Sequence, residues 1–98
     1  MKESDFQRRV IRRIKSNFPA CMVLKNDPNY IQGIPDLLIL FRDRWAALEC
    51  KQSSEASIRP NQQHYVAKMD MMSFARFICP ENEEEIFREL RQTFGVEG

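Results

Sequence analysis

The sequence contains few of the residues that mark specialised classes of protein. Its 98 residues include three cysteines, three glycines and one histidine. Cys21, Cys50 and Cys79 show no CxxC spacing, and His64 has no histidine or cysteine near it in the sequence. These counts argue against a disulfide framework and a zinc site, and they are typical of an intracellular protein with reduced thiols.

Long apolar runs are also missing. No run approaches the roughly 20 residues that span a bilayer, so we expect no association with a membrane. The first residues, MKESDFQRR, lack the apolar stretch of a secretory signal. We therefore expect an intracellular, cytoplasmic protein. Its length and its hydrophobic fraction of 43% predict one domain over residues 1–98.

The formal net charge of +1 conceals an uneven distribution. Residues 1–25 carry seven Lys or Arg against two acids, a balance of +5, whereas residues 80–98 carry six acids against two Arg, a balance of −4. A basic segment of this density is compatible with contacts to phosphates, and equally with the solvated face of a helix.

Hydrophobic periodicity predicts three helices and four strands. Phe6, Val10, Ile14 and Phe18, spaced by four, predict a first helix. The expected order is helix 2–18, strand 21–25, a hairpin with apolar runs at 37–41 and 45–48, helix 60–72, strand 74–79 and helix 81–94. This order predicts an α/β fold with a mixed central sheet flanked by helices.

The hairpin carries three charges at the ends of its strands. Asp36 opens the first strand, and Glu49 and Lys51 close the second. Such groups are costly to bury unless they are paired or bind a metal. We expect a turn centred between Asp43 and Arg44, which places Asp36 opposite Lys51. Glu49 is then the diagonal neighbour of Asp36, with Cβ atoms about 7–8 Å apart.

Two interpretations of these charges remain open. The two carboxylates lie close enough to share one ion through their oxygens. Alternatively, Asp36 and Lys51 form a simple cross-strand ion pair, and Glu49 lies at a solvated strand end.

Two further polar groups interrupt the apolar faces of helices. At about 100° per residue, Glu3 lies near 60° from Phe6, inside the apolar arc of the first helix. Gln62 lies beside Val66 and Met69 in the second helix. Both side chains are therefore expected to point inward, although an acid in a first turn also simply favours the helix dipole.

These residues resemble a known family. Pro35-Asp36, followed after a hairpin by Glu49-Cys50-Lys51, is similar to the PD-(D/E)XK nuclease signature. The wider pattern of GIPDLLI, ALECK, Gln62 opening a helix and an acid in the first helix resembles the small VRR-NUC branch. That branch includes stand-alone phage and bacterial nucleases and domains of DNA-repair enzymes. The resemblance covers nearly the whole chain and implies a restriction-endonuclease-like αβββαβ core, with the acidic C-terminal helix outside it.

The resemblance implies a metal centre. Asp36 and Glu49 would ligate a catalytic Mg²⁺ or Mn²⁺, helped by the backbone carbonyl of Cys50. Glu3 matches a helical acid that ligates the metal directly or through water. Ions of this kind prefer oxygen ligands and retain several waters, one of which can become the nucleophile.

It also implies catalytic roles for two further residues. Lys51 would orient or deprotonate the attacking water, or offset charge on phosphorus; the sequence leaves open which it does. Gln62 would hold the lysine, the water or the phosphate.

The implied activity is hydrolysis of DNA phosphodiester bonds by a metal-dependent endonuclease. We expect a homodimer that selects branched DNA such as four-way (Holliday) junctions, located in the host cytoplasm if the protein is phage-encoded. No base-reading motif is present, so phosphate contacts are expected to be independent of sequence. The basic residues available for them are Arg8, Arg9, Arg12, Arg13, Lys25, Arg42, Arg44 and Arg59.

Three other functions remain open. Flap, nicking or general DNA cleavage is the alternative within the same class of enzyme. A non-catalytic DNA-binding domain that retains the nuclease fold is the alternative outside it. RNA is a further possible substrate, because no residue visibly recognises a 2′-hydroxyl.

Overall fold

A computed structural model describes residues 1–97 of the chain. The elements are α1 (Glu3–Asn17), β1 (Met22–Lys25), β2 (Leu37–Phe41), β3 (Arg44–Cys50), α2 (Pro60–Met72), β4 (Ala75–Ile78) and α3 (Glu83–Phe94). This order confirms the α/β prediction, and the helix and strand ends lie within about two residues of those expected. None of the helices in residues 1–97 is long and apolar enough to cross a membrane.

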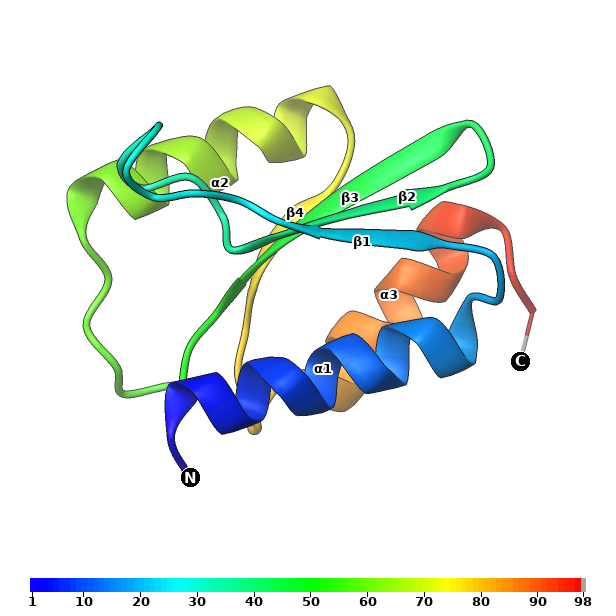
Figure 1. Ribbon diagram of the computed structural model, residues 1–98, viewed down its shortest axis with the longest axis horizontal. Helices are drawn as coiled ribbons and strands as arrows, with labels where there is room; N and C mark the ends of the chain where they lie inside the picture. The colour runs from blue at the N-terminus through cyan, green and yellow to red at the C-terminus, as the bar shows by residue number, and fades with distance from the viewer. Residues whose placement is uncertain (98) are drawn as a thin grey trace.

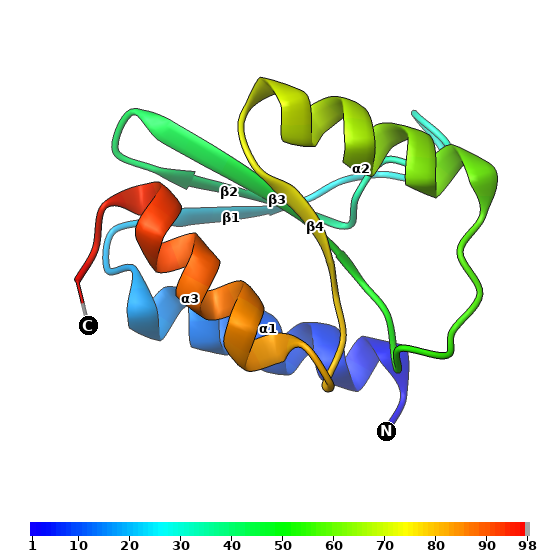
Figure 2. The same ribbon diagram turned by 180° about the vertical axis from the view of Figure 1, so that it is seen from behind.

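The four strands form one mixed sheet in the order β1-β2-β3-β4. The first two pairings are antiparallel, and β3 pairs with β4 in parallel through the crossover helix α2. α2 covers one face of the sheet, and α1 and α3 lie side by side on the other (Figures 1 and 2). The sheet is therefore the middle of three layers.

The two faces of the sheet are packed very differently. The face beneath α1 and α3 holds the main core, in which Phe6, Phe18, Phe87 and Phe94 are almost completely buried. The face beneath α2 holds a small cluster, with Val66 as the buried residue of the helix. Met72, the last residue of α2, is 65% exposed because α2 covers only part of the sheet.

The register of the β2–β3 hairpin corrects one prediction. The turn consists of Arg42 and Asp43, so Phe41 pairs with Arg44 and Leu37 pairs with Leu48. The expected centre, one residue later, was wrong. The Phe41 ring packs against two phenylalanines of the core, and the chain turns directly after it, with φ of 57° at Arg42.

The correct register changes the relation between the hairpin charges. Continuing the ladder by one pair beyond Leu37 and Leu48 places Asp36 opposite Glu49. The two acids are therefore direct neighbours, and Lys51 is not the residue that faces Asp36. In residues 1–97 the simple cross-strand ion pair between Asp36 and Lys51 is not formed, and Lys51 lies 4.0 Å from Glu49 instead.

Candidate metal centre and its cleft

The backbone at the end of the hairpin holds the two carboxylates in place. The Asp36 N–H donates to Oε1 of Glu49 at 3.2 Å, and the Cys50 N–H donates to Oδ2 of Asp36 at 2.9 Å. Each acid thus accepts a hydrogen bond from the strand that carries the other. Burial raises the pKa of the Cys50 thiol, so this residue contributes its backbone and not a thiolate.

The segment before β2 fixes the position of Asp36. Pro35 is fully buried and has no N–H to satisfy, which suits the start of a strand. Asn26, directly after β1, donates its backbone N–H to the Asp36 carbonyl at 2.9 Å and its side-chain N–H to the Pro35 carbonyl at 2.8 Å. These two hydrogen bonds from the end of β1 therefore fix the backbone of Asp36, the residue that carries the carboxylate.

The electrostatics of the pair are unfavourable when both acids are charged. Glu49 is only 4% exposed, and burial, followed by the charge of Asp36, raises its pKa to about 7. Burial also raises the pKa of Asp36, although the Cys50 N–H opposes this effect. The nearest cation to Glu49 in residues 1–97 is the Lys51 ammonium, 4.0 Å from Oε2. Among the described residues, the pair therefore lacks a closely bound counter-charge.

Gln62 connects Glu49 to Lys51. Its Nε2 donates to Oε2 of Glu49 at 3.1 Å, and its Oε1 accepts from Nζ of Lys51 at 2.8 Å and from the Arg59 N–H at 3.0 Å. Lys51 also donates to the Ser57 carbonyl at 3.1 Å. An ammonium has three donors, so one N–H of Lys51 remains for a ligand in the cleft that this residue lines.

The first turns of α1 contribute to the same site. Glu3 is exposed and lines the cleft that contains Asp36 and Glu49. The Gln7 side chain, one turn later, lies close enough to Asp36 to lower the pKa of this acid, against the larger effect of burial. Gln7 was missed in the sequence, although it lies about 100° from Phe6 and hence within the same apolar arc that singled out Glu3.

These residues fit a hard divalent cation held by few protein ligands. In residues 1–97 no three side chains from His, Cys, Asp and Glu converge as a metal-binding group, so Glu3 does not join the two acids as a direct third ligand. Mg²⁺ is commonly held by one or two carboxylates and keeps several waters. Asp36 and Glu49 provide that pair, and a divalent ion would relieve the repulsion between them.

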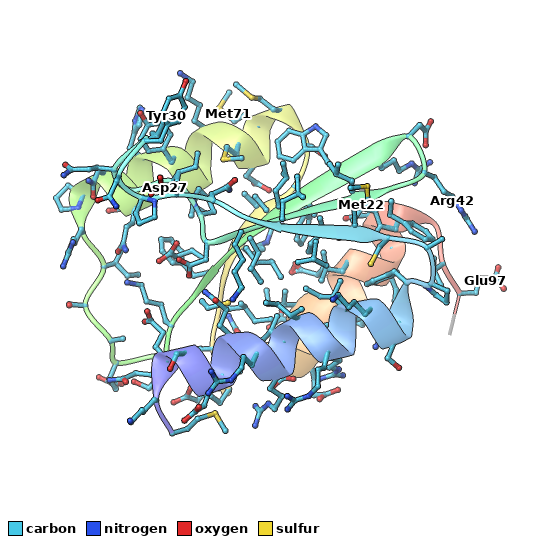
Figure 3. All side chains as sticks on the ribbon, viewed as in Figure 1. Met22, Asp27, Tyr30, Arg42, Met71 and Glu97 are labelled. Atoms are coloured by element: carbon cyan, nitrogen blue, oxygen red, sulfur yellow. The ribbon has the colours of Figure 1, made fainter. Side chains whose placement is uncertain are left out.

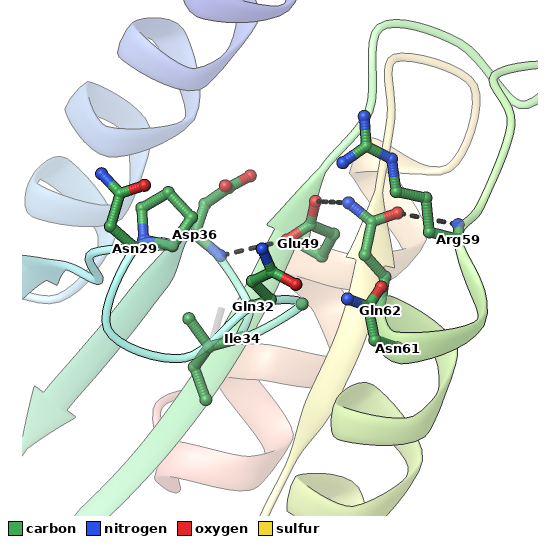
Figure 4. A pocket seen from close by; sticks show the side chains of 10 residues that line it. Asn29, Gln32, Ile34, Asp36, Glu49, Arg59, Asn61 and Gln62 are labelled. Atoms are coloured by element: carbon green, nitrogen blue, oxygen red, sulfur yellow. Dashed lines mark hydrogen bonds between the residues drawn. The ribbon is translucent and has the colours of Figure 1, made fainter.

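The carboxylate pair lies where two polar pockets meet. One pocket, of about 540 Å³, extends toward Glu3 and Lys51. The other, of about 280 Å³, lies between the loop before β2 and the first turn of α2 (Figure 4). Asp36, Glu49 and two residues of α2 and its preceding loop border both pockets. The two pockets therefore adjoin at the two acids, and we refer to them together as the cleft.

Most of the basic residues expected to contact DNA lie away from this cleft. Arg9 and Arg13 form ion pairs with Glu83 in α3, and Arg13 pairs with Glu84 as well. These arginines therefore join α1 to α3. Arg8 pairs with Asp5 on the exposed side of α1, where Arg12 is also exposed.

Two more of these arginines lie at the far end of the hairpin. Arg42 belongs to the turn, and Arg44 donates to the Thr93 carbonyl at 2.6 Å. Figure 3 shows Arg42 at the opposite end of the molecule from Asp27 and Tyr30. Of the eight basic residues, Arg59 lines the cleft and Lys25 is exposed at the end of β1 that adjoins it.

No family model, curated protein or solved structure matches this chain. The resemblance to VRR-NUC nucleases therefore stays a prediction.

Proposed function

We propose that this protein is a Mg²⁺- or Mn²⁺-dependent endonuclease that hydrolyses phosphodiester bonds in DNA. One observation carries the proposal: two adjacent buried acids, Asp36 and Glu49, share a polar cleft with a lysine that Gln62 ties to one of them. A protein that only binds DNA does not need two buried acids side by side, an arrangement in which the pKa of each acid is raised. Acid pairs of this kind concentrate at sites of chemistry.

The two acids would hold the ion, with the backbone carbonyl of Cys50 as a further oxygen donor and Glu3 positioned to act through water. When bound, the ion supplies a water of lowered pKa and a Lewis acid for the phosphoryl oxygen. The protein's own contribution is positional, since backbone N–H groups and Gln62 fix both carboxylates before any ligand enters.

Lys51 is a positively charged donor aimed at the reacting phosphate. Gln62 and Ser57 occupy two of its three N–H groups and thereby fix its direction. The remaining N–H is directed to a phosphoryl oxygen or to the attacking water. A preorganised donor of this kind stabilises the charge that develops in the transition state.

Branched DNA is the proposed substrate, with four-way junctions as the expected case. The cleft is polar, and Arg59 at its border supplies a cation for the phosphate backbone. Small size supports a preference for DNA shape, because a domain of 98 residues presents little surface for reading a long sequence.

We further propose that the protein acts as a homodimer through an apolar area that we call the sheet face. Met22 and Leu24 of β1 pair with Leu40 and Leu38 of β2, so all four side chains share the α2 side of the sheet. Met22 is 58% exposed and Leu24 is 39% exposed, because α2 covers only the β3–β4 half. Exposed apolar patches of this kind mark interfaces.

A cleavage panel tests the activity. The substrates are a four-way junction, a flap, a nicked duplex, a linear duplex and single-stranded DNA and RNA, each with Mg²⁺ or Mn²⁺. We expect cleavage that is fastest on the junction and absent with EDTA. Lys51→Ala should bind DNA and leave it uncut. Binding without cleavage by the wild type over hours would support the non-catalytic DNA-binding alternative.

Light scattering at micromolar concentration tests the dimer. We expect twice the 11.6 kDa chain mass for the wild type and the monomer mass for Met22→Glu. Met71→Glu is the matched control, since Met71 is 90% exposed on α2 and lies outside the sheet face. A monomeric wild type, with and without DNA, would contradict the homodimer.

A further inference from the structure

We infer that the smaller pocket of the cleft binds an unpaired nucleobase next to the phosphate that is cut. This inference rests on the proposed function and extends it to recognition of the substrate. We call the site the amide pocket and define it by Asn29, Gln32, Arg59 and Asn61, beside the two acids. Figure 4 shows Asn29 and Gln32 on the loop before β2, and Asn61 on the first turn of α2.

The three amide side chains of the pocket are free to bind a ligand. In residues 1–97, the side chains of Asn29, Gln32 and Asn61 make no hydrogen bond to another protein group. Amides with structural roles elsewhere behave differently: Asn26 and Asn82 each donate to a backbone carbonyl. An amide offers both a donor pair and an acceptor, which is the pattern that the edge of a base presents.

The charge of the pocket favours a neutral ligand over a second phosphate. Seven of its ten lining residues are uncharged and four of these are amides, with Arg59 as the cation and Asp36 and Glu49 as the anions. A second phosphate would find Arg59 as the one cation among the lining residues, whereas a base can use the uncharged amides. The volume of about 280 Å³ lies at the lower limit of small-molecule sites, roughly 300–1,000 Å³, and suits one ring system.

The pocket is built before any ligand arrives. Gly33 has φ of +88°, and a Cβ at this position would lie 2.7 Å from the backbone carbon of Asn61. Only glycine allows this approach, so the loop that carries Asn29 and Gln32 packs directly on the first turn of α2. The loop and the helix are thereby held next to each other, and the three amides line the space between them.

Only an unpaired base can enter a pocket beside the cleaved backbone, because a base in a duplex is stacked and paired inward. Branched DNA offers such bases where its strands separate. Asn and Gln side chains bind the N6–N7 edge of adenine well, so adenine is the favoured base. Selection of DNA shape thus includes one position at which the base itself is recognised.

The test uses duplex DNA with a single-nucleotide bulge, bound in Ca²⁺. The bulge carries adenine, fluorescent 2-aminopurine or an abasic sugar. We expect wild type to change the 2-aminopurine fluorescence and to bind the abasic bulge about tenfold more weakly than the adenine bulge. Gln32→Ala and Asn61→Ala should bind the two bulges with nearly equal affinity.

Gln63→Ala is the matched control, because Gln63 is an exposed amide on α2 that does not line the pocket. It should keep the preference of the wild type. Equal binding of adenine and abasic bulges by the wild type would overturn the inference, as would equal losses in Gln63→Ala and Asn61→Ala.

Cleavage of the same DNA in Mg²⁺ separates this inference from the proposed function. Cleavage without a preference for the base would overturn only the inference about the amide pocket. A preference for the base without cleavage would overturn only the proposed endonuclease activity. Absence of both binding and cleavage would overturn both proposals.

Discussion

Glu49 and Glu83 are both buried glutamates, but their surroundings are opposite. Glu83 is 7% exposed and accepts hydrogen bonds from Arg9 and Arg13, which reach it from α1. Glu49 is 4% exposed and lies beside Asp36, with its nearest ammonium 4.0 Å away. One carboxylate is neutralised by the fold, and the other is buried next to a second acid.

The difference separates a stabilising ion pair from a functional site. The ion pairs of Glu83 connect α1 to α3 above the main core and help to hold the two helices together. The Glu49 pair lies at the border of the thinly packed α2 layer and lines a cleft. Unfavourable electrostatics persist in a protein when function requires them.

The largest expected contrast is in catalysis. Glu49→Gln should reduce DNA hydrolysis by at least about 10³-fold, roughly 4 kcal/mol of transition-state stabilisation, because it removes a ligand of the ion. Glu83→Gln should cleave at the wild-type rate below its melting temperature. Steady-state cleavage at 25 °C and calorimetry of Mn²⁺ binding measure both effects. Equal Mn²⁺ affinity in the wild type and Glu49→Gln would disprove the metal centre.

For stability we expect the opposite order, with Glu83→Gln more damaging than Glu49→Gln. Glu83→Gln replaces the carboxylate that faces Arg9 and Arg13 with a neutral amide, and it should lower the free energy of unfolding by about 1 kcal/mol, since both arginines are partly exposed and Arg13 keeps Glu84. Glu49→Gln removes a like charge beside Asp36 and should leave the stability at pH 8 unchanged or higher. Urea denaturation without metal compares the two. A larger loss in Glu49→Gln would contradict this assignment of roles.

The pH dependence of unfolding sharpens the comparison further. The pKa of Glu49 is about 7 in the folded state, whereas its ordinary value is 4.5. Between pH 4.5 and pH 7, the folded protein therefore holds a proton on Glu49 that the unfolded chain has released. The contribution of this group to stability is complete below pH 4.5 and is lost as the pH rises through 7.

We therefore expect the stability without metal to fall between pH 5 and pH 8, by on the order of 1 kcal/mol from Glu49 after allowing for water in the cleft. Glu49→Gln should flatten this slope, and Glu83→Gln should keep it. Saturating Mg²⁺ should raise stability most at pH 8, where the acids are charged. The melting temperature of the three proteins across this range provides the measurement.

The smallest expected contrast concerns two arginines. Arg59→Ala should weaken DNA binding about fivefold and reduce the salt slope by about one unit, because Arg59 lines the cleft. Arg13→Ala should leave DNA affinity unchanged, since this guanidinium is held by Glu83 and Glu84. Fluorescence anisotropy at several salt concentrations distinguishes them. A larger loss of affinity in Arg13→Ala would restore α1 as a DNA-binding face.

Local patterns in the sequence were sufficient to predict the elements. Spacing by four at Phe6, Val10 and Ile14 reflects the buried face of α1, and a proline marks the start of α2. The same reasoning placed Gln62 at the site, because an amide beside Val66 has to find polar partners when it points inward.

Features that depend on contacts distant in the sequence were not predictable. The turn at Arg42 and Asp43 comes directly after Phe41, whose ring packs against Phe18 and Phe94, both distant in the sequence. Arg9 and Arg13 were expected to contact DNA phosphates because nothing local shows that α3 lies beside α1. The amide pocket likewise exists only because a loop and a helix 28 residues apart, at Gly33 and Asn61, touch.

The hairpin register has a consequence for how such a chain can change in evolution. Asp36 and Glu49 face each other at the open end of the β2–β3 ladder, and the turn closes the other end. One residue added to each strand would extend only the distal tip and leave the acids paired. A single residue added within one strand would rotate the acid beyond it to the opposite side of the sheet. The interval between the acids can therefore lengthen in steps of two, and relatives with longer hairpins would keep this centre intact.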